Sequence, residues 1–206
     1  MSFLREFFRN PRQTGSIAAS SGPVVRMLLG CVDVGGARRA VELGAGEGAV
    51  TAELRRQLPA DTPLLAVELN ADFAKKLRRR FTPPGVQVHH RSAVELPDLL
   101  AEQDWPSVDL VVSGLPWTLM SARDQADTLD AIAVALAPDG EFVTLACLHQ
   151  SVLAPGRRLR QQLEDRFGEV HRQPIVWAAV PPMIAYRCAG PIRRVTTDTA
   201  ANHARP

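Results

Sequence analysis

Cysteine and tyrosine are scarce in this sequence of 206 residues, which holds three cysteines and a single tyrosine. Cys31, Cys147 and Cys188 lack the spacing of metal ligands, so we expect no metal site. Their odd number favours free thiols in a reducing cytoplasm, and we interpret them as small core residues. No apolar run reaches the roughly 20 residues that a transmembrane helix needs, and the amino terminus lacks the long apolar core of a secretory signal. These absences favour an intracellular protein that is soluble or bound to a membrane surface.

The charge of the chain is nearly balanced but unevenly placed. The formal net charge is +2, and 46% of the residues are hydrophobic, so a packed core is expected and a wholly basic nucleic-acid-binding surface is not. Residues 1–40 have a net charge of +4, which leaves −2 for the remainder. A cationic amino-terminal end on a mildly acidic body favours an anionic partner for that end.

From residue 40 onward, apolar runs of strand length alternate with amphipathic stretches of helical length. Strands are predicted at residues 40–43, 64–67, 86–89, 108–112, 141–148, 170–180 and 183–188. Helices are predicted at residues 23–29, 49–58, 71–81, 122–136 and 155–167. Only Pro181-Pro182 links the last two strands, which is too short for a crossover helix, so this pair is antiparallel. We therefore predict an α/β fold with a seven-stranded, mostly parallel sheet, an antiparallel last strand and short amino-terminal helices.

The first predicted strand runs into a glycine-rich turn that starts a helix. Its pattern is Glu42-Leu43-Gly44-Ala45-Gly46-Glu47-Gly48, which is G-x-G-x-G and not the G-x-G-x-x-G that binds a pyrophosphate. Glycines let the backbone turn tightly and approach a ligand closely. The carboxylate of Glu42 before the turn suits a cationic amino group better than a phosphate. A glycine turn without a ligand is the alternative.

A second acidic residue, Glu68, ends the second predicted strand just over 20 residues after the glycines, and Leu69 follows it. A carboxylate at this place accepts hydrogen bonds from both hydroxyls of a ribose. A surface carboxylate is the alternative. Together with Glu42 and the glycines, Glu68 indicates a nucleoside ligand with a positive group and no diphosphate, and S-adenosylmethionine fits that description.

On these residues the chain resembles class I S-adenosylmethionine-dependent methyltransferases, which have a Rossmann-like sheet. The resemblance implies that the glycine turn faces the methionine part of the cofactor and that Glu68 binds the ribose. It also implies that the loop of Ser92, Ala93 and Val94 holds the adenine, with Ser92 standing where the family commonly has an aspartate. The product would be S-adenosylhomocysteine.

The fourth predicted strand ends in Ser113-Gly114-Leu115-Pro116-Trp117. Open α/β sheets bind the reacting group beyond the carboxyl ends of such strands. In amine-methylating relatives a polar residue, a proline and an aromatic residue stand here. By resemblance Ser113 and the carbonyl of Leu115 would accept hydrogen bonds from the target amine, and Trp117 would hold it by a cation–π contact. A core aromatic is the alternative for Trp117.

Two groups of relatives share such a motif. The rRNA adenine dimethylases are similar through the core, but they carry a basic RNA-binding domain that this chain lacks. The bacterial phospholipid N-methyltransferases are more similar, through the segments 15–21, 113–116 and 181–187. This resemblance places Tyr186 in the acceptor pocket. His149, after the fifth strand, is a candidate general base or an incidental loop histidine.

The sequence thus predicts a methyltransferase that acts on the amine of a phospholipid such as phosphatidylethanolamine, with a soluble metabolite or rRNA adenine as the alternative acceptor. A non-catalytic cofactor-binding scaffold is a further alternative. We expect residues 1–39 to form a helical cap, 40–192 the methyltransferase domain and 193–206 a disordered polar tail. Residues 1–10 alternate like an amphipathic helix, so residues 1–12 either contact an anionic membrane or pack on the domain. We expect a monomer in the cytoplasm, peripheral on the inner face of the plasma membrane.

Overall fold

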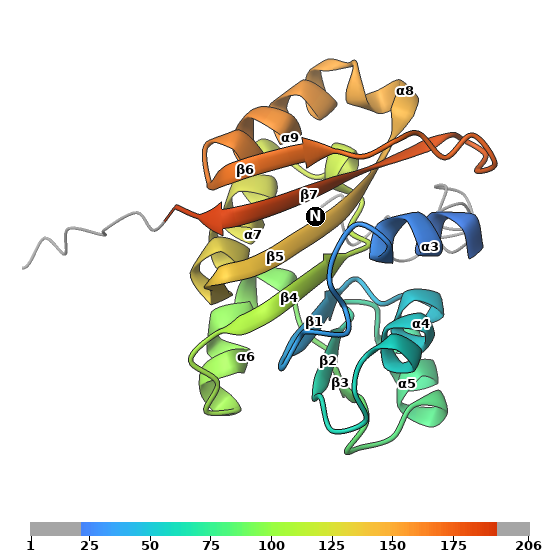
Figure 1. Ribbon diagram of the computed structural model, residues 1–206, viewed down its shortest axis with the longest axis vertical. Helices are drawn as coiled ribbons and strands as arrows, with labels where there is room; N and C mark the ends of the chain where they lie inside the picture. The colour runs from blue at the N-terminus through green and yellow to red at the C-terminus, as the bar shows by residue number, and fades with distance from the viewer. Residues whose placement is uncertain (1–21, 193–206) are drawn as a thin grey trace, which may run out of the picture.

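The computed structural model describes residues 22–192, which form a seven-stranded sheet between two layers of helices (Figure 1). The strand order is β3-β2-β1-β4-β5-β7-β6. The strands are β1 (Ala40–Leu43), β2 (Leu64–Val67), β3 (Gln87–His89), β4 (Val108–Ser113), β5 (Leu136–Cys147), β6 (Phe167–Arg172) and β7 (Met183–Pro191). Strands β2 and β3 lie on one side of β1, and β4 and β5 lie on the other. The loops that follow these strands therefore meet at the carboxyl edge of the sheet beside β1 and β4, where open α/β sheets bind ligands.

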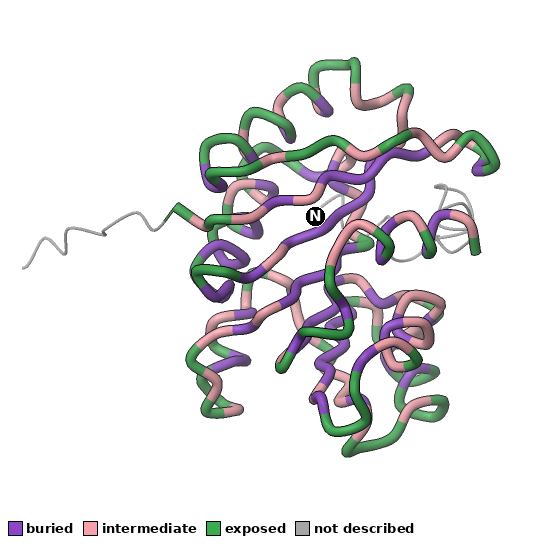
Figure 2. The backbone as a smooth tube through the Cα atoms, in the orientation of Figure 1, coloured by how far each residue is buried: buried purple, intermediate pink, exposed green. Residues whose placement is uncertain are grey.

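Helices cover both faces of this sheet. One layer contains α3 (Gly22–Leu29), α4 (Ala49–Gln57) and α5 (Ala71–Arg80), and the other contains α6 (Leu96–Glu102), α7 (Ala122–Ala135) and α9 (Ala154–Glu164), with the short α8 (Leu148–Ser151) at its edge. Leu54 and Leu77 belong to the core under the first layer, while Leu99, Leu129 and Leu159 belong to the core under the second. The central strands are therefore buried along most of their length, as Figure 2 shows.

The predicted seven-stranded, mostly parallel sheet with an antiparallel last strand is confirmed. Strand β7 lies between β5 and β6 and runs antiparallel to both. The sixth strand was predicted too long, since β6 ends at Arg172 and residues 173–182 form a loop. This loop contains residues of high β-propensity, but Ile175 packs against the core on one side of the sheet and Val176 against the core on the other. Local propensity did not reveal that contact.

Two further elements differ from the sequence prediction. Helix α6 was missed because its apolar positions Leu96, Leu99 and Leu100 span too few residues for a clear helical period. Strand β5 begins at Leu136 instead of residue 141, so Pro138 lies within a strand. The predicted helix of residues 1–10 and the predicted tail of residues 193–206 lie outside the described residues. No helix within residues 22–192 combines the length and apolar character that crossing a membrane requires.

Candidate active site

A cavity of about 170 Å³ opens at the carboxyl edge of the sheet. Six of the residues predicted from the sequence line it, namely Gly44, Leu69, Ser92, Ala93, Val94 and Leu115. They come from the turn after β1, the end of β2, the loop after β3 and the loop after β4. The fold therefore brings together four segments that lie as much as 71 residues apart in the chain.

The walls of this cavity suit a planar ring. Leu69 and Val94 are large apolar side chains that are exposed in a molecule whose other leucines are mostly buried. Exposed apolar groups inside a cavity provide a surface on which an aromatic ring can be buried. Ser92 begins the short 3-10 helix η2 (Ala93–Glu95) with a capping box, in which its side chain accepts from Glu95 N and its own N–H donates to Glu95 Oε1. Ser92 thus shapes the loop while it borders the cavity.

The glycine turn after β1 is held in a conformation that side chains rarely adopt. Gly44 has φ 77°, and a Cβ on it would lie 3.0 Å from Leu115 Cδ2. Gly48 has φ 82°, and a Cβ there would collide with Leu77 and Phe81. Gly44 therefore borders the cavity, whereas Gly48 lets α4 pack closely on α5. Ala45, between the glycines, is buried in the core.

Glu68 connects two of the segments that form the site. Its Oε2 accepts a hydrogen bond from Gly46 N at 2.8 Å, and its Oε1 accepts one from Asn70 N at 2.7 Å. The side chain is buried, and this burial raises the pKa of the carboxyl group. Each oxygen of a carboxylate offers two acceptor sites, so Glu68 keeps capacity for ribose hydroxyls beyond these two bonds.

Glu42 is buried on the side of β1 that faces α4. It accepts a hydrogen bond from Thr51 Oγ1 at 2.5 Å and does not border the cavity. Burial raises the pKa of the Glu42 carboxyl group to about 8, although the hydrogen bond from Thr51 acts in the opposite direction. Glu42 is therefore mainly uncharged at neutral pH, and the predicted direct pairing with a cationic amino group is not the arrangement that the structure shows.

The residues predicted to bind the acceptor amine are mostly buried in the core. Trp117 is 1% exposed, and its indole Nε1 donates to Thr144 Oγ1 at 2.5 Å. Ser113 is fully buried, and its Oγ accepts from Leu115 N at 3.2 Å. The carbonyl of Leu115 accepts from Trp117 N at 3.0 Å. Only the Leu115 side chain reaches the cavity, because packing turned the polar groups of this segment inward.

Tyr186 and His149 are also away from the cavity. Tyr186 is 4% exposed on β7, opposite Thr144 in the strand register, and burial raises its pKa. The structure thus makes it a core residue and not part of the cavity lining. His149 is exposed on α8 and does not border the cavity, so the general-base role has no support from its position.

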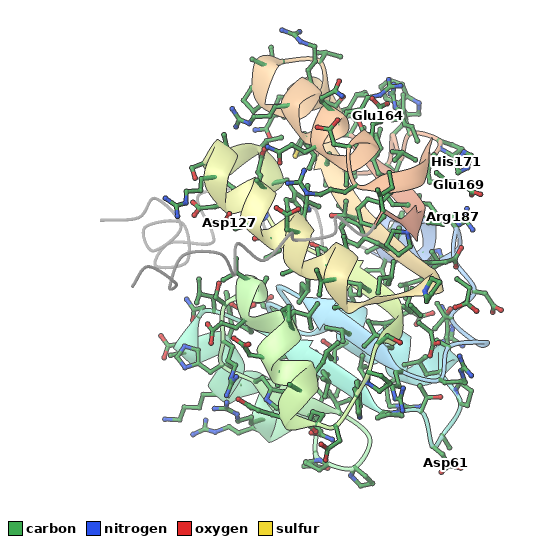
Figure 3. All side chains as sticks on the ribbon, turned by 90° about the vertical axis from the view of Figure 1, so that its left-hand side faces the viewer. Asp61, Asp127, Glu164, Glu169, His171 and Arg187 are labelled. Atoms are coloured by element: carbon green, nitrogen blue, oxygen red, sulfur yellow. The ribbon has the colours of Figure 1, made fainter. Side chains whose placement is uncertain are left out.

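Sequence reasoning missed one wall of the cavity, which comes from the start of α7. Met120, Asp124, Asp127 and Thr128 lie there at helical spacing, and Asp127 forms an ion pair with Arg123 at 3.5 Å. Figure 3 shows Asp127 on the other side of the view from Glu169 and Arg187. The i, i+3 and i+4 spacing of these residues, directly after the strand-four loop, was the available signal. Val67 and Arg91 complete the lining.

A Rossmann-like sheet with a cavity beside a glycine turn at its carboxyl edge, and an acid at the end of the second strand, is typical of nucleoside-binding enzymes. Comparison with known proteins identifies the family. Residues 40–140 match the model of a methyltransferase domain. A curated ornithine lipid N-methyltransferase from Singulisphaera acidiphila is 32% identical over 141 residues, which cover 68% of this chain and 73% of that protein. The chain belongs to the class I S-adenosylmethionine-dependent methyltransferases, and S-adenosylmethionine is its cofactor.

Solved structures show the same fold. A putative O-methyltransferase from Klebsiella pneumoniae superposes with a TM-score of 0.61 at 19% identity, over 91% of this chain and 90% of that one. The N-methyltransferase NodS from Bradyrhizobium japonicum superposes with a TM-score of 0.60 at 16% identity, over 90% and 97% of the two chains. At these identities the likeness establishes the architecture and not the acceptor.

Proposed function

We propose that this methyltransferase modifies the amine of a membrane lipid, with phosphatidylethanolamine or a related aminolipid as the acceptor. The observation that carries the proposal is the 32% identity to an ornithine lipid N-methyltransferase over two thirds of the chain. The segments around Ser113 and Tyr186, which resemble phospholipid N-methyltransferases, support it.

The residues at the cavity have distinct parts in this reaction. Leu69 and Val94 line the cavity and hold the adenine between apolar surfaces, and Glu68, the residue before Leu69, accepts hydrogen bonds from the ribose. The bound cofactor supplies a methyl group already activated by its sulfonium, so the protein needs no nucleophile of its own. Its task is to align the amine with the methyl group and to exclude water.

The amine must lose its proton before it attacks. His149 and Tyr186 do not border the cavity, whereas Asp124 and Asp127 do. We assign the proton-accepting groups at the cavity to these two carboxylates, with transfer onward to solvent. Ser113, Trp117 and Thr144 act beneath the site by fixing the loop that carries Leu115.

A labelling experiment tests the acceptor. The protein is incubated with methyl-labelled cofactor in separate tubes containing phosphatidylethanolamine vesicles, total RNA or a metabolite extract. We expect label in the lipid, and a protein with Glu68→Ala should transfer less. Label only in RNA or in a water-soluble product would refute the lipid acceptor, and cofactor binding without any transfer would favour a scaffold.

We also propose that the protein is cytoplasmic and peripheral on the inner face of the plasma membrane. The cationic, amphipathic character of residues 1–12, which lie outside the described residues, supports this placement. A basic amphipathic segment binds anionic lipid weakly and reversibly when it is this short.

A further inference from the structure

The loop between β6 and β7 exposes apolar side chains although it is anchored to the core. Trp177 is 69% exposed and Val180 is 88% exposed. Ala179, next to Val180, is buried, and Ile175 and Val176 pack against the two cores of the domain. Val176 and Met183 also form a β-bridge. The exposure of Trp177 and Val180 is therefore part of an ordered structure in which neighbouring side chains are buried.

A second exposed apolar segment adjoins this loop. Val152 and Leu153, in the turn between α8 and α9, are both exposed. The amino end of α8 is tied to the loop, because Leu148 N donates to Pro182 O at 2.9 Å. Figure 1 shows α8 and the β6–β7 loop at the same corner of the molecule. We call Val152, Leu153, Trp177 and Val180 the apolar corner.

The surroundings of the apolar corner are basic. Residues 148–163 and 170–182 contain no aspartate or glutamate, and they include exposed Arg157 and Arg172. Arg157 Nη1 donates to Val152 O at 2.6 Å, which places its charge directly beside the corner. The acids that bound these segments lie at the ends of α9 and β6 away from the corner, since Glu164 is the last residue of α9 and Glu169 lies near the start of β6.

The apolar corner shares an edge of the sheet with the cofactor cavity. Met183 at the start of β7 pairs with Cys147 at the end of β5, so the loop before Met183 lies at the carboxyl edge of the parallel strands. Gly44 and Leu115 border the cavity at that same edge. A flat surface that contacted the corner would thus lie along the edge on which the cavity is located.

We propose that the apolar corner docks on an anionic lipid bilayer, with Trp177 and Val180 entering the interface and Arg157 and Arg172 facing lipid headgroups. Tryptophan suits this position because its ring is apolar and its N–H can remain in the hydrated layer. Anionic headgroups complement these two segments, which carry exposed arginines and contain no aspartate or glutamate. The purpose of this docking, delivery of lipid to the cavity, rests on the proposed lipid acceptor, but the docking itself does not.

Intrinsic fluorescence tests the proposal at the residue concerned. Trp105 is partly buried beside Arg39 and Trp117 is buried, so Trp177 is the exposed tryptophan of the three in the sequence. Vesicles of phosphatidylcholine mixed with phosphatidylglycerol should shift the emission of the full-length protein to shorter wavelength and protect it from iodide. Trp177→Phe should lose this shift. Unchanged emission of the native protein at vesicle concentrations that sediment it would overturn the proposal.

Vesicle sedimentation provides the second measurement. The double variant Trp177→Ser, Val180→Ser should bind the mixed vesicles about tenfold more weakly, since it loses the apolar groups that enter the lipid. Val134→Ser is the matched control, because Val134 is 63% exposed at the carboxyl end of α7, on the opposite edge of the sheet. The native protein should also bind vesicles of phosphatidylcholine alone more weakly than it binds the mixed vesicles. Equal binding of the double variant and the native protein would contradict the docking surface.

These vesicles contain no primary amine, so binding is measured without methyl transfer. The protein could methylate lipid in detergent micelles while the double variant binds vesicles as well as the native protein does. That result would refute the docking surface and leave the proposed function intact. Vesicle binding that depends on Trp177, together with label only in soluble products, would support the docking surface and refute the lipid acceptor. Self-association that the double variant abolishes, without vesicle binding, would assign the corner to a second copy and overturn the proposal.

Discussion

The two halves of the carboxyl edge of the sheet differ in how side chains and backbone contribute to them. Beside β1, β2 and β3, the predicted residues Gly44, Leu69 and Val94 line the cavity. Beside β4, β5 and β7, the predicted residues Trp117 and Tyr186 are buried in the core. The first half depends on turns and strand ends that local sequence dictates. The second half depends on which face of the sheet a side chain packs against, and that is decided by distant parts of the chain.

Thr144 explains the second half. It lies in register between Ser113 on β4 and Tyr186 on β7. Its Oγ1 accepts from the indole of Trp117 and donates to the carbonyl of Ser113 at 3.2 Å. The polar groups that resembled an acceptor site form a buried row across three strands, and this row fixes the loop that borders the cavity.

Trp117 gives the clearest test of the difference between the two halves. Replacing it with alanine should cost about 3–5 kcal/mol of unfolding free energy, because it leaves a cavity and removes the indole N–H that donates to the buried Thr144 Oγ1. Chemical denaturation measures this loss. Trp177→Ala is the control, since an exposed indole should change stability by no more than about 0.5 kcal/mol. Normal stability of Trp117→Ala with methyl transfer abolished would restore the acceptor role of the indole.

Glu42 provides a pH-dependent test within the first half. Its pKa in the folded protein is about 8, above the usual value of 4.5 that the unfolded chain has. Between these values the folded protein holds a proton that the unfolded chain has released, so stability falls as pH rises through this window. The loss by pH 8 should reach up to about 4 kcal/mol.

The variant Glu42→Gln lacks this titration. Its unfolding free energy should therefore depend less on pH, and its stability relative to the native protein should increase between pH 5 and pH 8. Denaturation curves at the two pH values measure the difference. Parallel pH dependence in both proteins would show that Glu42 is ionised in the folded state and would reopen a direct pairing with a cationic group.

The sequence predicted the strands β1 and β2 with their observed bounds, because short apolar runs were bounded by clear breaks. It also predicted segments that border the cavity, since a glycine turn and a strand end occur at fixed points of a parallel sheet. It did not place Asp124 and Asp127, which reach the cavity only through the docking of α7. Likewise, nothing local distinguished Trp117, which is buried, from Trp177, which is exposed.

Glu68 gives the smallest expected effect and the most direct test of the cofactor half. Its carboxylate accepts hydrogen bonds from Gly46 N and Asn70 N, and in our proposal it also accepts from the ribose hydroxyls. Glu68→Gln keeps an oxygen that can accept hydrogen bonds but loses the charge, so calorimetry should show cofactor affinity reduced by roughly tenfold, about 1.4 kcal/mol. Glu68→Ala should bind more weakly still, because it also frees the glycine turn. If Glu68→Ala weakens binding and Glu68→Gln does not, the residue acts by holding the turn. Unchanged affinity in both variants would place the ribose elsewhere. The two halves of the edge would then be alike, because the sequence would have predicted the binding groups of neither.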